Sequence, residues 1–303
     1  MEAMLLSPPA GAAEAADLAS PRDADENALR AWRAECPELR AMWDEGEPVT
    51  AWEGVTFDEG GRVVDLNAFC KGLTGDVPAA LGGLTALTGL CLAGNRLTSV
   101  PAALGGLTAL KTLDIQGNRL TSVPAALGAL TLLEALDLGE NRLSSVPAEL
   151  GGLTALTSFF LGGNLLTSVP AAFGGLTALK VLSLKGNQLT SVPEALGGLT
   201  ALTGFCLIGN RLTSVPAALE GLTALEWFEL TGNQLTTLPA ELRGCIALRE
   251  LRLSGNQLTS VPAALGRLTA LRALYLSENP LTSVPAEWEQ GGTLEESGCR
   301  ISR

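Results

Sequence analysis

The sequence predicts an α/β solenoid, in which short repeated units, each with a strand and a helical turn, stack into one long coil. The first observation is a period, since nine asparagines follow one another at intervals of 23 residues. The second is that Leu90 and Leu92 alternate with Gly89, Cys91 and Ala93, which is typical of a strand with one buried face. The third is an apolar content of 47%, which is enough to form a core.

The asparagine of each unit comes where the chain leaves the strand. Its amide both donates and accepts, so we expect it to satisfy backbone groups of neighbouring turns inside the coil. Val100-Pro101 then predicts an extended stretch, and residues 102–107 predict a short helical or 3₁₀ turn that ends in glycine. The asparagines with this structural role are Asn95, Asn118, Asn141, Asn164, Asn187, Asn210, Asn233, Asn256 and Asn279.

The frame of the units is L-x-x-L-x-L-x-x-N-x-L-T-S-V-P-A-A-L-G-G-L-T-A, which resembles the typical 23-residue class of the leucine-rich repeat family. The resemblance covers residues 62–294, or about ten repeats. It implies a right-handed solenoid of horseshoe shape with a parallel β-sheet on the concave face. Members of this family mostly bind proteins through that sheet.

The acidic charge is concentrated before the repeats, because residues 1–60 carry 14 Asp and Glu against 4 Lys and Arg. We expect residues 1–24 to form a disordered tail rich in Ala, Pro and acidic residues. Residues 25–61 are expected to form a helical N-terminal cap, with an Asp near residue 25 as the N-cap and a break at Pro37. Trp32, Trp43 and Trp52 are expected to cover the open end of the coil.

At the other end, residues 295–303 are expected to form a short polar tail. Trp288 and Leu294 take apolar positions of the repeat frame before it. We expect no further strand after residues 273–275, because the chain stops before the frame is completed.

Residues 52–55 resemble the N-terminal cap of plant-type leucine-rich-repeat receptors, whose pattern is C-x-W-x-G-V-x-C. Thr50 and Phe57 stand at the two cysteine positions, so the disulfide of that cap is missing. Together with the lack of an export signal and of Asn-x-Ser/Thr sequons, this predicts a cytoplasmic location. The six cysteines are expected to be free thiols, with a pair between Cys36 and Cys70 left open.

Composition excludes several classes of function. The chain has no histidine, which removes His-dependent triads and His metal ligands. A net charge of −12 makes nucleic acid an unfavourable partner, and no apolar run is long enough to span a membrane. No phosphate-binding loop or kinase signature occurs. We therefore expect a monomer without catalytic activity, metal or cofactor.

Variation between repeats gathers on the solvent side of the strands, which indicates a ligand face, with drift at unconstrained positions as the alternative. Interface anchors are enriched in aromatic residues and arginine, although scattered surface aromatics need no explanation. For Phe160 both interpretations stand, whereas charged neighbours favour a binding role for Trp227. The candidate partner-binding residues are Asp114, Asp137, Phe160, Trp227, Glu229, Glu250, Arg252 and Tyr275.

Asp114 and Asp137 are expected to lie roughly 5 Å apart in one column of the sheet. One interpretation is a cation site or an acid–base pair. The other is a solvated acidic patch, which we prefer because an open sheet does not exclude water.

These observations predict a non-enzymatic intracellular interaction protein, acting in signalling or defence-type recognition, with a protein partner on the concave face. A preorganised solenoid loses little entropy on binding. One alternative is a passive structural repeat protein without a defined ligand, motivated by the low divergence between repeats. The other is an extracellular receptor ectodomain, motivated by the plant-like cap.

Overall fold

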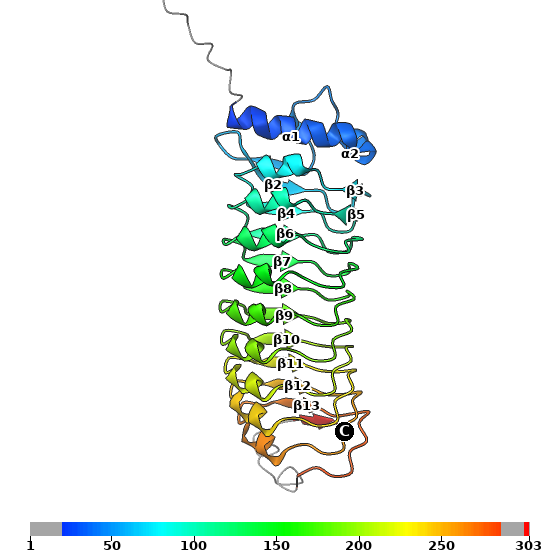
Figure 1. The fold of residues 1–303 in the computed structure, drawn as a ribbon, viewed down its shortest axis with the longest axis vertical. Coiled ribbons are helices and arrows are strands. Elements are labelled where there is room, and N and C mark those ends of the chain that lie inside the picture. The colour runs from blue at the N-terminus through cyan, green and yellow to red at the C-terminus, as the bar shows by residue number, and fades with distance from the viewer. Residues whose placement is uncertain (1–19, 286–299, 303) are drawn as a thin grey trace, which may run out of the picture.

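The computed structural model describes residues 20–285 and 300–302, and its strands lie side by side along an elongated coil (Figure 1). Twelve of them form one sheet, in which β1 and β2 are antiparallel and the neighbours from β2 onward are parallel. In sheet order these strands are β1 (Val55–Phe57), β2 (Val63–Asn67), β4 (Gly89–Cys91), β6 (Thr112–Asp114), β7 (Ala135–Asp137), β8 (Ser158–Phe160), β9 (Val181–Ser183), β10 (Gly204–Cys206), β11 (Trp227–Glu229), β12 (Glu250–Arg252), β13 (Ala273–Tyr275) and β14 (Arg300–Ser302).

Short 3₁₀ turns, rather than full helices, bring the chain back after each strand. Pro101 caps one such turn, Ala102–Gly106, because its fixed φ of −77° suits the extended residue before the turn. Gly105 is required in this turn, since a Cβ there would lie 2.4 Å from the carbonyl oxygen of Ala126 in the next turn. The other turns of the repeats are Ala79–Gly83, Ala125–Ala129, Ala148–Gly152, Ala171–Gly175, Glu194–Gly198, Ala217–Gly221, Ala240–Gly244 and Ala263–Arg267.

A ladder of asparagines joins each turn of the coil to the turn before it. Asn164 Nδ2 donates to the carbonyl oxygens of Leu138 and Leu161, and its Oδ1 accepts from Leu143 N–H, each at 3.0 Å. Leu138 and Leu143 belong to the preceding repeat, so one side chain satisfies backbone groups of two turns. The same three bonds recur at Asn95, Asn118, Asn141, Asn187, Asn210, Asn233, Asn256 and Asn279.

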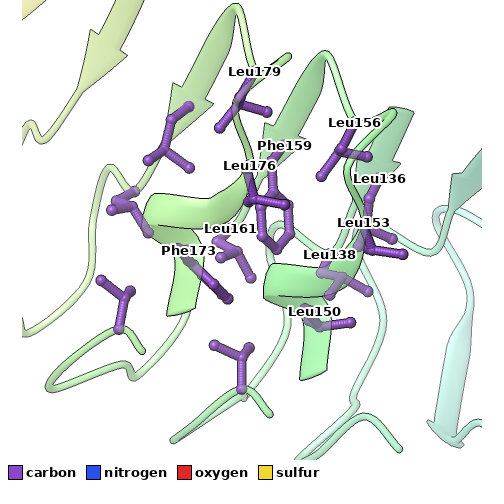
Figure 2. Packing of buried hydrophobic residues seen from close by; sticks show 14 of the residues in the cluster. Leu136, Leu138, Leu150, Leu153, Leu156, Phe159, Leu161, Phe173, Leu176 and Leu179 are labelled. Carbon is purple, nitrogen blue, oxygen red and sulfur yellow. The ribbon is translucent and has the colours of Figure 1, made fainter. Parts of the chain in front are cut away.

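The core is one continuous column of leucines between the sheet and the 3₁₀ turns. Figure 2 shows Phe159 from the sheet and Phe173 from a 3₁₀ turn among these leucines, and the two ring centroids are 5.3 Å apart. Burying each leucine side chain contributes about 1.5–3 kcal/mol. Because a single repeat leaves both of its flanks open, this gain is available only when the repeats stack.

Two helices, α1 (Pro21–Glu35) and α2 (Pro37–Met42), cover the N-terminal end of the coil (Figure 1). The N-cap of α1 is Ser20, which forms a capping box with Asp23, so the helix starts before the expected cap boundary at residue 25. Asp25 is therefore not the N-cap. It is buried, and it accepts hydrogen bonds from the Arg62 guanidinium at 2.7 Å and from Val63 N–H at 3.0 Å.

Tryptophans close the cap where a disulfide was missing from the sequence pattern. Trp43 stacks on Trp52, with ring centroids 4.8 Å apart, and meets the edge of Trp32 at 6.0 Å. Their indole N–H groups are satisfied, because Trp43 donates to the Glu53 carbonyl and Trp52 to the Asp44 carbonyl, both at 2.9 Å. Cys36 and Cys70 are free thiols, so the disulfide that the sequence left undecided does not form.

Three further strands depart from the sequence-based expectation. β3 (Thr74–Asp76) and β5 (Arg96–Ser99) form a small parallel sheet on another side of the coil. β14 pairs in parallel with β13, so the prediction of no strand after residue 275 is wrong. An open sheet edge offers free N–H and C=O groups to any nearby segment, which is the physical reason.

Some sequence-based expectations fall outside the described residues, namely the tail up to residue 19, Trp288 and Leu294. Neither helix in the described chain combines the length and apolarity needed to cross a lipid bilayer.

We predict that Asn164→Ala lowers the free energy of unfolding by about 3 kcal/mol, because it leaves buried backbone groups of two turns unpaired. Urea unfolding followed by circular dichroism measures the change. The matched control is Asn67→Ala, since the exposed Asn67 accepts one hydrogen bond, from Phe69 N–H. Equal losses in the two variants would contradict a special role for the ladder.

Candidate functional site

The parallel register places equivalent residues of successive repeats in columns on the solvent side of the sheet, here called the concave face. Asp137 of β7 is in register with Phe160, Phe160 with Ser183, and Ser183 with Cys206. The same column continues through Glu229 and Arg252 to Tyr275. Neighbouring residues in a column are about 4.8 Å apart, so the candidate residues lie along one strip of the molecule.

A hollow of about 370 Å³ opens in the middle of this strip, over β7 to β11. Phe160 and Trp227 are both half-buried and stand three strands apart at its walls. Its floor is low because small residues, Ser183 and Cys206, occupy the two strands between the walls. Three candidate residues line the hollow, namely Asp137, Phe160 and Trp227.

The indole of Trp227 lies beside a glycine on the neighbouring strand. A Cβ at Gly204 would lie 3.5 Å from the ring of Trp227 and 3.8 Å from the side chain of Val181. The indole therefore leans over the bare backbone of β10, and Val181 approaches it from β9. With Ile208, which is exposed after β10, these side chains make the β9–β11 end of the hollow apolar.

The β7 end of the hollow is charged. Asp137 Oδ1 accepts a hydrogen bond from Gly139 N–H at 2.8 Å, and Asp114 Oδ1 accepts from Gln116 N–H at 3.0 Å. Burial raises the pKa of the Asp137 carboxyl, and Asp114 and Glu140 raise it further, while the Gly139 hydrogen bond and Lys185 lower it. Asp137 is thus a carboxylate whose charge is only partly compensated.

Glu140 reaches the hollow from a strained backbone position. Its φ is +50°, whereas seven of the repeats from Gly94 to Gly255 have glycine at the equivalent position, as in Gly163. Left-handed backbone is unfavourable for residues with a Cβ. The Glu140 carboxylate lies above Gly163, where a Cβ would come within 2.5 Å of it.

Lys185 follows β9, and its side chain extends toward the charged β7 end of the hollow, where Glu140 lies. A Cβ at Gly162 would lie 2.6 Å from its Cγ, so the lysine stem runs over that glycine. Among the ion pairs of the described residues, none within 4.0 Å joins Lys185 to Asp137 or Glu140.

The remaining candidate residues form a separate cluster on β11 to β13. The Arg252 guanidinium contacts Glu250, lies 3.5 Å from Glu229 and stacks 5.1 Å from the centre of the Tyr275 ring. Glu229 is only 2% exposed and accepts from Thr231 N–H at 3.0 Å, so it is not the surface residue that its column predicted. Hydrogen bonding to Glu250 raises the pKa of Arg252. The positive charge of Arg252 is therefore compensated by carboxylates of this chain.

The surroundings of Asp114 and Asp137 favour an acidic patch over a cation site as the interpretation of this pair. The described residues contain no group of three or more acidic or cysteine side chains that could hold a metal ion. Both carboxylates instead accept backbone N–H groups, which suits an acidic rim better than a cation cage.

Sequence reasoning missed several residues of the hollow. Gln116, Lys185 and Ile208 occupy the position directly before the glycine-asparagine pair, and Glu140 takes the place of the glycine itself. The position of Gln116, Lys185 and Ile208 varies between repeats as much as the central column does, and that variation is a usable signal, whereas Glu140 stands where most repeats have glycine. They were overlooked because they follow the strand, whereas the period-two argument covers only the strand.

We predict that Arg252→Ala lowers the free energy of unfolding by about 3 kcal/mol, because it leaves the buried Glu229 without its cation. Adding Glu229→Gln is expected to recover most of this loss. The matched control is Arg249→Ala, whose pair with Glu226 has both side chains exposed, by 66% and 46%, and is worth about 0.5 kcal/mol. Chemical denaturation of the parent, the two single variants and the double variant checks the prediction. Equal losses of stability in Arg252→Ala and Arg249→Ala would contradict it.

A second prediction concerns pH. Because the pKa of Asp137 is raised above 3.8, the folded state binds its proton more tightly than the unfolded chain does. Ionised Asp137 therefore costs stability above its folded pKa, and that cost is lost as the pH falls through it. We expect Asp137→Asn to be more stable than the parent at pH 7, with a gap that narrows toward pH 3.8. Urea midpoints between pH 3.8 and pH 7 measure this difference in stability. The control for losing one charge is Glu149→Gln, at an exposed position.

Comparison with known proteins begins with sequence profiles. The profile described as "Leucine rich repeat" matches residues 108–166 and 206–258. The profile described as "Leucine Rich repeats (2 copies)" matches residues 85–128 and 246–287, and a single-repeat profile matches residues 178–199. A curated relative, the receptor protein kinase WSS1 of Oryza sativa subsp. japonica, is 40% identical over 97 residues, which are 31% of this chain and 10% of that protein.

Solved structures show the same fold. The ectodomain of the Arabidopsis thaliana membrane receptor kinase GASSHO1/SCHENGEN3 aligns with a TM-score of 0.78 and 33% identity, over 86% of this chain and 33% of that one. The Arabidopsis receptor kinase HAESA, in complex with the peptide hormone IDA and the co-receptor SERK1, aligns with a TM-score of 0.73 and 28% identity, over 84% and 46%. The chain thus spans less than half of each of these proteins.

The expected cytoplasmic location is contradicted by these similarities, because the matched proteins are receptor kinases and one of the structures is a membrane-receptor ectodomain. The missing cap cysteines do not indicate a cytoplasmic location, and the reason is physical. Stacked tryptophans and the buried Asp25–Arg62 pair hold the cap together, so the lack of a disulfide does not diagnose a reducing compartment. Repeated profile matches, the asparagine ladder and the parallel sheet together show that this chain belongs to the leucine-rich repeat family.

Proposed function

We propose that this chain is a receptor-type recognition module, which binds a protein or peptide partner on its concave face and does not catalyse a reaction. The observation that carries the proposal is the hollow between Phe160 and Trp227, because two aromatic walls over a floor of small residues can enclose a side chain of a partner. The complex of HAESA with a peptide hormone supports a peptide as the class of ligand.

Rigidity supports recognition on this face. The strands beneath the hollow are hydrogen bonded on both sides. Backbone hydrogen bonds between repeats continue beyond the strand ends, since Leu138 N–H donates to Phe160 O at 2.9 Å and Glu140 N–H to Gly162 O at 2.7 Å. A surface held in this way loses little conformational entropy when a partner binds. The binding surface is therefore formed before the partner arrives.

A non-catalytic role is supported by the openness of the site and by its side chains. The whole sequence lacks histidine, and Asp137 of the hollow accepts a backbone hydrogen bond at its rim. General acid–base catalysis requires a group of tuned pKa that faces an enclosed substrate. The open hollow offers side-chain recognition instead.

The test uses a phage-displayed library of random 12-residue peptides, selected on the full chain. We predict that Phe160→Ala with Trp227→Ala weakens the binding of most selected peptides by about 30-fold or more, as expected when a central aromatic anchor is lost. The matched control changes Leu132 and Ile246 to Ala, since these apolar residues are 54% and 65% exposed in turns outside the concave face.

The proposed site fails if the selected peptides tolerate the concave-face pair of changes, or if they depend equally on the control pair. Circular dichroism and urea midpoints of both double variants show whether each retains its fold. Fluorescence anisotropy of labelled peptides gives the dissociation constants.

A further inference from the structure

We infer that the hollow is selective for an extended peptide segment that carries a large apolar side chain and, three or four residues away, a lysine or arginine. This inference rests on the proposed function, and it names the chemistry of the ligand that the site takes. It is carried by the unequal ends of the hollow and by the distance between them.

The first step is that one end is apolar. Phe160, Val181, Ile208 and Trp227 surround the part of the hollow above β9 and β10. Trp227 and Phe160 are half-buried walls, and the side chains between them are short. An apolar side chain placed here is removed from water on several sides, which contributes about 25 cal/mol per Å² of buried apolar area.

The second step is that the other end carries excess negative charge. Asp137 and Glu140 line it, Asp114 is in register beside Asp137, and Lys185 is the cation among the lining residues. Three carboxylates thus face one ammonium group, which forms no ion pair with Asp137 or Glu140 within 4.0 Å among the described residues. A cationic ligand group compensates this charge, whereas a ligand carboxylate is repelled.

Asp137 itself is stabilised by such a ligand. Burial, Asp114 and Glu140 all raise the pKa of its carboxyl, which means that its ionised form lacks sufficient compensation. A guanidinium or ammonium group placed nearby favours the ionised form. Lys185 already acts in this direction, but its stem is committed to the surface of Gly162.

The third step is the spacing. From β7, which carries Asp137, to the floor between β9 and β10 is two to three strand separations, or about 10–14 Å. An extended chain advances about 3.3 Å per residue, and a polyproline-type chain about 3.1 Å. Residues i and i+4 of an extended chain point to the same side, as do residues i and i+3 of a polyproline-type chain. A basic and an apolar side chain separated in this way reach both ends together.

The test compares synthetic peptides of 12 residues that contain one phenylalanine and one lysine in a Gly/Ser background. The lysine is placed four residues from the phenylalanine, placed next to it, or replaced by glutamate. We expect the four-residue spacing to bind at least tenfold more tightly than the other two forms, with a difference that shrinks as salt is added. Microscale thermophoresis on the full chain gives the constants.

Variants of the protein assign the preference to the named residues. Asp137→Asn with Glu140→Gln is expected to abolish the preference for lysine over glutamate while binding through phenylalanine persists. Lys185→Ala is expected to increase that preference, because a competing cation is removed. The charge-matched control is Glu149→Gln with Glu194→Gln, two exposed residues on the 3₁₀ turns, and it should behave like the parent.

The outcomes separate this inference from the proposed function. Binding that requires Phe160 and Trp227 but ignores the lysine and its spacing overturns the inference and keeps the concave-face site. Library selections whose peptides never depend on Phe160 and Trp227 overturn both. A lysine preference that survives in the Asp137–Glu140 variant shows a different acidic surface, and it overturns the assignment to this hollow.

Discussion

The buried asparagine is the constraint on which the rest of this structure depends. Its amide occupies the point where each turn leaves the sheet, and it satisfies backbone groups of its own turn and of the preceding one. Buried backbone groups without partners would otherwise cost about 1–3 kcal/mol each. Because the amide reaches one repeat back along the coil in every unit, the turns stay at a constant separation, and the strands stay in register. The columns of the concave face are a consequence of that register.

On such a regular scaffold, function depends on the irregular side chains. The hollow exists because Ser183 and Cys206 are short where Phe160 and Trp227 are long, with the indole lying beside Gly204. The backbone beneath them does not change from repeat to repeat. A small number of substitutions in a repeated frame therefore suffices to create a recognition site, without any insertion or special loop.

The charged residues of the concave face divide into two kinds according to their partners. Arg252 is held by Glu229, Glu250 and Tyr275, so its charge stabilises the far end of the sheet and is not free for a partner. Asp137 is only partly compensated, and Glu140 occupies a strained backbone position to reach the same hollow. Strain and incomplete charge compensation both reduce stability, and their coincidence at one hollow distinguishes it from the remainder of the face.

The sequence by itself determined the period, the leucine core and the columns, because a repeat of 23 residues converts distance along the chain into position along the coil. It placed Phe160, Trp227 and Asp137 on the concave face for the same reason. The tertiary structure alone decided which of the candidate residues meet. Glu229 is buried and Arg252 is neutralised because their side chains reach across strands, and Lys185 and Glu140 join the hollow from positions beyond the strand. Periodicity specifies where each Cα lies, whereas side-chain length, the neighbouring glycines and the packing of adjacent repeats determine what each side chain contacts.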